Sequence, residues 1–261
     1  MKRAALVLIA ACAATSAAEA GRAWAYQGAT VTGGGAVAGT VRFTGSIPAP
    51  VELPVTKDPS VCGEMKTSQE LVISSTRGIK NAIVTIEGIS AGKPLEIPEA
   101  PILANAKCLY EPHVQALPVG TRLQIVNDDP VLHNTHGVLG GSKSVFNIAL
   151  TTRGRMIRKL LKEPGLIEVG CDAGHTWMKA YVLVSEHPYY AVTDTSGAYS
   201  IKDVPPGTYS MTIWHEMLGK QTREVTVRSD ASSDESFSYE PVPAVPAPAE
   251  GSQSPGAGTP Q

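Results

Sequence analysis

The sequence predicts an all-β protein. Its 261 residues include 25 glycines and 20 prolines, and only 18% of them are charged. This composition favours many turns and short strands over helices. No window shows a long apolar stripe with the 3.6-residue period of an amphipathic helix. A chain of this length suggests one large domain or two small ones.

The first twenty residues have the pattern of a bacterial export signal. Lys2 and Arg3 form a basic start, residues 4–14 are apolar and rich in alanine, and residues 18–20 fit a small-x-small cleavage site. Cys12 ends a weak lipoprotein motif, but the apolar run before it is short, so we expect no lipid anchor. No later run is long and apolar enough to span a bilayer. We therefore expect a periplasmic or secreted protein.

The strands follow from short apolar runs and from alternation of apolar and polar residues. Predicted strands cover residues 36–43, 71–75, 81–87, 105–109, 122–127, 145–150, 155–161, 166–169, 180–184 and 224–228. Residues 91–101 are rich in proline and predict a connector. In residues 230–261, Ser, Asp, Pro, Ala and Gly dominate, and such a composition cannot build a core. We expect a disordered tail there.

One loop carries the residues that indicate function, Cys171-Asp172-Ala173-Gly174-His175-Thr176-Trp177-Met178. It lies between two predicted strands, so a thiol, an imidazole and a thioether gather at one end of a sheet. Soft thiolate and thioether ligands select copper, and imidazole suits it. A blue-copper site needs two histidines and one cysteine in a plane, with a long axial methionine. One more histidine must therefore come from another strand.

His133 is the candidate for that second histidine. It follows the predicted strand 122–127 and the turn Asp128-Asp129-Pro130. His136 would face the opposite side of a strand, because successive side chains alternate, and is not favoured. The two aspartates are interpreted as a turn, since they lack the further oxygen ligands that calcium requires. His113, His187 and His215 are interpreted as packing or surface residues.

Residues 117–185 resemble the cupredoxins, specifically the amicyanin-like, mononuclear blue-copper proteins. The resemblance rests on the context of His133, a strand followed by Asn127-Asp128-Asp129-x-x-x-His133-Asn134, and on the Cys…His…Met loop. It implies a Greek-key β-sandwich, one copper ion and single-electron transfer with a partner protein, rather than an enzyme. The implied ligands are His133, Cys171, His175 and Met178. The loop has one residue more between Cys and His than amicyanin has. A binuclear site would need a second cysteine where Ile167 stands.

The resemblance also implies two details of the site. Asn134 would tie the two ligand segments together by hydrogen bonds. The loop histidine, His175, would present its ring edge at the surface, inside a weakly polar rim where a partner docks.

The number of cysteines agrees with a copper thiolate. Three cysteines remain after export, and an odd thiol in an oxidising compartment needs an explanation. A disulfide between Cys62 and Cys108 would leave Cys171 free, as a metal thiolate must be. The net charge of −2 is mild and argues against nucleic acid as a partner, which would call for a basic patch.

A second resemblance lies downstream, to the carboxypeptidase regulatory-like domain, a small transthyretin-like β-sandwich without peptidase chemistry. It is carried by Thr193-Asp194-x-x-Gly197-x-Tyr199 and Pro205-Pro206-Gly207-x-Tyr209. Residues 38–43 and 80–87 look like the first half of such a module. The expected segments are a signal at 1–20, an N-terminal β segment at 36–97, a cupredoxin-like domain at 99–187, a regulatory-like segment at 188–229 and a tail at 230–261.

Two other functions remain open at this point. The chain could be a copper-binding carrier without a redox partner. It could also be an adhesion or carbohydrate-binding β-sandwich whose copper site is vestigial, an idea favoured by the regulatory-like block. Metal content of the purified protein separates the last alternative from the other two.

Overall fold

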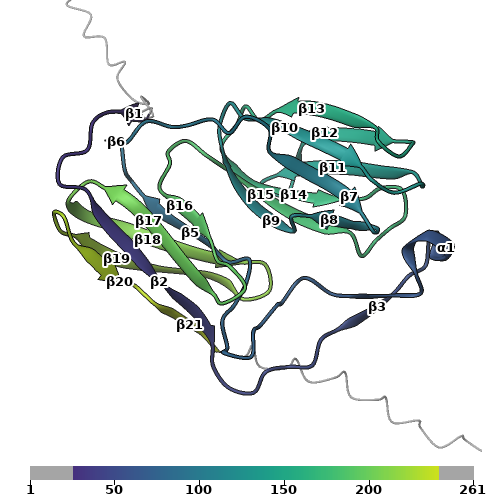
Figure 1. The fold of residues 1–261 in the computed structure, drawn as a ribbon, viewed down its shortest axis with the longest axis horizontal. Coiled ribbons are helices and arrows are strands. Elements are labelled where there is room, and N and C mark those ends of the chain that lie inside the picture. Colours follow the sequence, from purple (N-terminus) through teal and green to yellow (C-terminus); the bar gives the residue numbers. More distant parts are fainter. Residues whose placement is uncertain (1–25, 241–261) are drawn as a thin grey trace, which may run out of the picture.

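The computed structural model describes residues 26–240, and almost all of its regular structure is β-strand (Figure 1). The all-β prediction is confirmed. The expected export signal and Cys12 lie outside the described residues, and so does the part of the expected tail after residue 240. Within residues 26–240, no helix is long and apolar enough to cross a membrane.

Two sheets enclose the first hydrophobic core, in strand orders β13-β10-β7-β8 and β12-β11-β14-β15-β9. The core forms because apolar residues alternate along the strands: Leu123 and Ile125 face inward from one sheet, and Ile167 and Val182 from the other. The strands are β7 (Ile102–Ala106), β8 (Leu109–Glu111), β9 (Val114–Pro118), β10 (Arg122–Asn127), β11 (His133–Leu139), β12 (Lys143–Leu150), β13 (Met156–Leu160), β14 (Gly165–Gly170) and β15 (Lys179–Ser185).

A second pair of sheets encloses a separate core, in strand orders β16-β5-β18-β19 and β17-β2-β20, with β21 also pairing with β2. Val37 and Ile201 face Val84 and Ile213 across this core. The strands are β2 (Gly35–Phe43), β5 (Ile83–Glu87), β16 (Tyr190–Val192), β17 (Ala198–Val204), β18 (Gly207–His215), β19 (Gly219–Val227), β20 (Ser232–Asp234) and β21 (Phe237–Tyr239). The expectation of two β-sandwiches is confirmed.

Four short strands and one helix lie outside these sheets. β1 (Gln27–Gly28) pairs in parallel with β6 (Ala91–Gly92). β3 (Glu52–Pro54) and β4 (Met65–Thr67) form a hairpin with the helix α1 (Pro59–Cys62) between them. Figure 1 shows β3 and α1 leaving the second sandwich and running toward one end of the first.

The two sandwiches contact each other through a few specific side chains. The imidazole of His113 pairs through Nε2 with the carboxylate of Glu216, and both side chains are buried. Beside them the rings of Tyr181 and Trp214 pack edge to face with centroids 5.0 Å apart. As expected, His113 serves packing.

The strand predicted at residues 71–75 is wrong. The chain turns there, and the only pairing is an isolated bridge between Ile73 and Ile79. The Ser74 hydroxyl accepts from the backbone N–H of Gly78, which closes the turn. A serine and a threonine that bond locally compete with strand pairing, and here the local bonds win.

The predicted tail begins too early. Residues 232–239 form β20 and β21, which both pair in parallel with β2. Phe237 and Tyr239 alternate with the exposed Ser238 and are buried in the second core. The prediction considered the polar composition of the segment and overlooked that its two aromatic residues stand two positions apart, as on one face of a strand.

Phe237→Ala should lower the free energy of unfolding by about 3–5 kcal/mol, the usual loss for a buried phenylalanine. The ring also lies 3.6 Å from the guanidinium carbon of Arg223, so a cation–π contact is lost with it. Urea denaturation measures the change. Ser238→Ala, one residue away and exposed, is the control and should have little effect. Equal stability of the two variants would contradict this packing.

The strands before and after the first sandwich pair with each other. β2 pairs with β17, and β5 pairs with both β16 and β18. We propose that these strands form one discontinuous folding unit, into which the first sandwich is inserted. The single hydrophobic core shared by residues 37–86 and 189–239 supports this division.

A fragment of residues 186–229 should therefore not fold cooperatively, because it lacks the strands that cover its apolar faces. A chain joining residues 26–97 to residues 186–240 through a short linker is the matched control and should fold. Thermal denaturation followed by circular dichroism compares the two. A cooperative transition of the short fragment would sink the proposal.

Candidate metal centre

Three of the four predicted ligands meet at one end of the first sandwich. His133 is the first residue of β11, Cys171 follows the last residue of β14, and His175 lies in the loop that leads to β15. All three side chains are buried, and one donor atom from each lies within 4.8 Å of the others. Antiparallel pairing of β11 with β14 brings the two segments together, since His136 pairs with Gly170.

The three side chains of the cluster lie close to one another. Cys171 Sγ is 3.6 Å from Nδ1 of His175, and the rings of His133 and His175 have centroids 4.6 Å apart. Nδ1 of His133 is buried and makes no hydrogen bond within the described residues. A buried polar atom without a partner is costly and marks a place where a ligand is expected. Cys171 is the free cysteine of the described chain.

The outer nitrogen of each ring is bound by a carboxylate. Nε2 of His133 lies 2.9 Å from Oδ2 of Asp129, and Nε2 of His175 lies 3.1 Å from Oδ2 of Asp58. A carboxylate accepts only from a protonated nitrogen, so each ring keeps a lone pair on Nδ1. Such carboxylate–histidine pairs fix the ring orientation at metal sites and raise the basicity of the ligand nitrogen.

Burial keeps both rings neutral. Desolvation lowers the pKa of His133 and of His175 below the ordinary value of 6.5, although the nearby carboxylates act in the opposite direction. Burial thus favours the uncharged imidazole, which is the form that can donate a lone pair to a metal.

The loop between Cys171 and β15 is a compact turn. Gly174 has φ +96°, a backbone conformation that favours glycine. The backbone N–H of Met178 donates to the carbonyl of His175 at 3.0 Å, and the Met178 side chain is buried in the same hydrophobic cluster as Cys171. Met178 is thus buried in the core of the first sandwich, in the turn that follows His175.

Two further side chains hold the ligand segments. The Tyr110 hydroxyl donates to the carbonyls of Asn134 and Gly170, at 2.8 and 2.9 Å, and so joins the ends of β11 and β14. Burial, followed by the nearby Cys171, raises the pKa of Tyr110. The backbone N–H of Asn134 donates to Cys171 Sγ at 3.4 Å, while its side-chain amide donates to Asn147 on β12.

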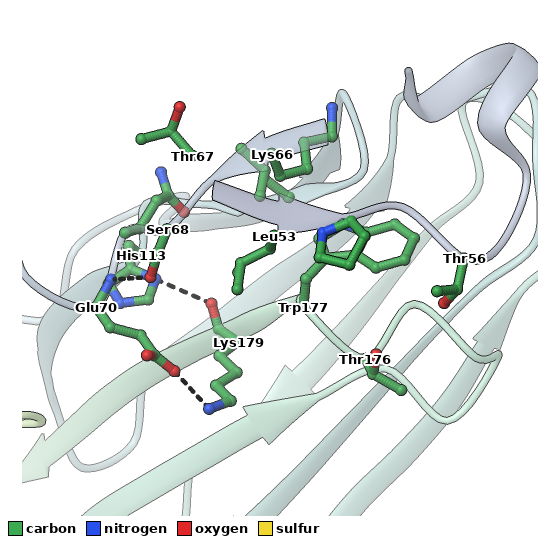
Figure 2. Close-up of a pocket in the computed structure, with 13 residues that line it drawn as sticks. Leu53, Thr56, Lys66, Thr67, Ser68, Glu70, His113, Thr176, Trp177 and Lys179 are labelled. Atoms are coloured by element: carbon green, nitrogen blue, oxygen red, sulfur yellow. Dashed lines mark hydrogen bonds and ion pairs between the residues drawn. The ribbon is translucent and has the colours of Figure 1, made fainter. Parts of the chain in front are cut away.

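Trp177, in the loop between Cys171 and β15, contacts both His175 and the turn that carries Cys108. Its ring packs edge to face against His175 with centroids 5.4 Å apart, and its Nε1 donates to the carbonyl of Cys108 at 2.9 Å. Figure 2 shows Trp177 beside the β3–β4 hairpin, at one wall of a pocket of about 360 Å³. Lys179 and Glu70, which also line this pocket, form an ion pair, and His113 is a further lining residue (Figure 2).

The predicted exposure of His175 is wrong. Its side chain is completely buried, because the segment that carries Asp58 lies over the ring edge that was expected to face solvent. The ring of His175 therefore presents no exposed edge on which a partner could dock. His136, by contrast, behaves as expected: it is partly exposed, pairs with Asp172 and takes no part in the cluster.

The predicted disulfide is confirmed. Cys62 and Cys108 are bonded, with Cα atoms 5.4 Å apart. Both sulfurs lie within 4.8 Å of a ring nitrogen of His175.

Sequence reasoning missed the two carboxylates. Asp129 could have been found from the sequence, because it lies four residues before His133 in a predicted turn. Asp58 carried none, since it is 117 residues from His175.

Comparison with known proteins gives one family match. Residues 172–240 match the carboxypeptidase regulatory-like domain. This confirms the second resemblance found in the sequence. The match covers less than half of the chain, and its first residues include the loop after Cys171 and strand β15. No curated protein matches the chain.

Several solved structures are similar to part of the chain. A copper-containing nitrite reductase from Thermus scotoductus SA-01 is 25% identical over 36% of this chain, with a TM-score of 0.31. The matched part spans only 24% of that enzyme. A purple cupredoxin from Nitrosopumilus maritimus is 29% identical over 34% of this chain and 100% of its own, with a TM-score of 0.29. An amicyanin variant is 25% identical over 39% and 98%, with a TM-score of 0.26.

Asp129→Ala should lower the free energy of unfolding of the metal-free protein by about 3 kcal/mol or more. The Asp129 carboxylate accepts from the backbone N–H groups of Lys107 and Cys108 as well as from His133. Hydrogen bonds to a charged group contribute about 1.5–3 kcal/mol each. Urea denaturation measures the loss. Asp128→Ala, an exposed neighbour, is the control, and a similar loss in both variants would contradict the assignment.

Proposed function

We propose that this is an exported protein that binds one copper ion through His133, Cys171, His175 and Met178 and transfers single electrons. The observation that carries the proposal is a buried thiol beside two Nδ1 atoms, in rings whose Nε2 atoms are both held by carboxylates. That arrangement brings one donor atom of each of the three side chains close to the other two. The unpartnered Nδ1 of His133 fits a metal better than it fits a packed core.

The donor chemistry favours copper over the other common metals. Structural zinc sites use four cysteine or histidine ligands, and the described cluster offers three. Two imidazoles, one thiolate and a nearby thioether form the set typical of blue copper. A copper ion held by these donors supplies one-electron redox chemistry.

The protein residues prepare the site before any metal arrives. Asp58 and Asp129 hold the imidazoles in the correct tautomer, and Tyr110 fixes the spacing of the two ligand strands. Burial of Cys171 and of both rings excludes water. A site that is rigid and dry needs little rearrangement when its charge changes, which is what rapid single-electron exchange requires.

An exported location is supported by the Cys62–Cys108 disulfide. Such bonds persist in oxidising compartments and are rare in the bacterial cytoplasm. The partner in electron transfer would be another redox protein of the same compartment.

A copper carrier without a redox partner is the second candidate. The burial of both histidine rings favours it, because an electron carrier of this kind usually needs a ligand edge near its surface. Electron self-exchange of the copper-loaded protein discriminates: a fast rate supports electron transfer, and negligible exchange supports the carrier.

Copper(II) loading should give an intense visible absorption from thiolate-to-metal charge transfer, with one ion bound per chain. Cys171→Ser should abolish the band, because the soft anionic donor is lost. His136→Ala is the matched control and should keep it, since that ring pairs with Asp172 away from the cluster. Absorption spectroscopy and elemental analysis measure both. Wild-type protein that binds no stoichiometric copper and stays colourless would end the proposal.

A further inference from the structure

One segment near the candidate metal centre belongs to neither pair of core sheets. We call residues 52–67, which contain β3, α1 and β4, the cover segment. Its hairpin is pinned by pairing of Glu52 with Thr67 and of Pro54 with Met65. Leu53 and Val55 pack against the core of the first sandwich. The segment therefore adheres to the end of the sandwich where the ligand loop lies.

Asp58 is the residue through which the cover segment touches the centre. Its Oδ2 lies 3.1 Å from Nε2 of His175, and the imidazole is fully buried although the neighbouring Asp172 and Gly174 are exposed. Lys57 extends over Gly174: a Cβ on that glycine would lie 3.7 Å from Cγ of Lys57. The cover segment thus encloses the outer edge of the ligand loop.

The conformation of Asp58 argues against a purely structural role. It stands at the N-cap of α1, where an aspartate side chain normally accepts a hydrogen bond from the first turn of the helix. No such bond is made. Its backbone is also left-handed, with φ +50° and ψ +48°, which is uncommon for a residue other than glycine. The carboxylate is directed to His175 in place of the helix.

The disulfide fixes this contact in place. Cys62, four residues after Asp58, is bonded to Cys108, which is fully buried in the first sandwich. The Cys108 sulfur also lies within 4.8 Å of a ring nitrogen of His133 and of a carboxylate oxygen of Asp129. The bond therefore anchors the cover segment directly beside both imidazoles.

We propose that the cover segment is a positioning device: the Cys62–Cys108 disulfide holds Asp58 on Nε2 of His175, which keeps Nδ1 of that ring turned toward Cys171. The same contact closes the outer edge of His175, so exchange of metal or of reagents at the Cys171 thiol requires the segment to lift. Only the statements about metal rest on the proposed function. The positioning of His175 is a property of the metal-free protein.

The first experiment uses metal-free, full-length protein with its disulfide intact. Nitrogen-15 NMR of the imidazoles should show His175 as the neutral tautomer that carries its proton on Nε2. Asp58→Ala should convert this signal to a mixture of tautomers, because the acceptor on Nε2 is gone. Asp58→Asn, whose amide oxygen still accepts, should retain the wild-type tautomer. Glu64→Ala, an exposed carboxylate on the same segment, is the control and should change nothing.

Alkylation of Cys171 by iodoacetamide measures the closure of the site in the same metal-free samples. The reaction should be slow in wild type and in Glu64→Ala, and faster in Asp58→Ala. It should also be faster in the double variant Cys62→Ala/Cys108→Ala, where the anchor is lost. Unchanged tautomer and unchanged alkylation rate in Asp58→Ala would overturn the proposal.

The third measurement tests the consequence for metal. Loss of a carboxylate that orients a histidine ligand weakens metal affinity by about 10–100-fold. Asp58→Ala should therefore release copper to a chelator about 10–100 times faster than wild type, and adding the Cys62→Ala/Cys108→Ala change should add little, because both act through one contact. Copper release that is equal in Asp58→Ala and Glu64→Ala would refute the effect on metal. Wild type that binds no copper would refute the proposed function and leave the NMR result standing.

Discussion

Two imidazole rings and a thiol are taken out of water at the ends of neighbouring strands, and this desolvation shapes the whole region. A buried imidazole with an unbonded N–H is costly, so each ring must find an acceptor for its outer nitrogen. Asp129 and Asp58 supply the two acceptors. With the outer nitrogens bound, Nδ1 of His175 lies 3.6 Å from Cys171 Sγ, and the buried Nδ1 of His133 has no hydrogen-bond partner among the described residues. The hydrogen bonds that the two Nε2 atoms make therefore orient the rings of the donor cluster.

The surrounding scaffold is built to keep those acceptors fixed. Asp129 is held in a turn by two backbone N–H groups, those of Lys107 and Cys108, whose own conformations are left-handed. Cys108 then carries the disulfide to the cover segment, and its carbonyl accepts from Trp177. One short turn between β7 and β8 therefore connects both carboxylates and the indole that packs on His175. Few of these contacts are apolar, and hydrogen bonds and one covalent bond set the geometry.

The second sandwich has a different part in the molecule. Its strands come from both ends of the described chain, and β20 and β21 complete it by pairing with β2. It touches the first sandwich through His113, Glu216 and the Tyr181–Trp214 pair, and Tyr181 lies on β15, the strand that follows the ligand loop. Its own connection between β2 and β5 is the stretch from which the cover segment is drawn. The second sandwich thus contributes a piece of chain to the centre, while its hydrophobic core remains separate.

The sequence by itself determined the all-β fold class, many of the strands, the free thiol and the donor types. The strands follow from an alternation of apolar and polar residues with a period of two. The donors of the loop lie three or four residues apart, so the chain itself keeps them close together. It also indicated His133, because a strand and a turn place it. It failed at residues 71–75, where local hydroxyl bonds win over strand pairing, and at residues 232–239, where two aromatics were hidden in a polar composition. Only the tertiary structure decided that His175 is covered, that Asp58 meets it and that a disulfide lies beside both rings. Such contacts join residues far apart in the chain, and their existence depends on how two sheets and a hairpin pack, which no local pattern encodes.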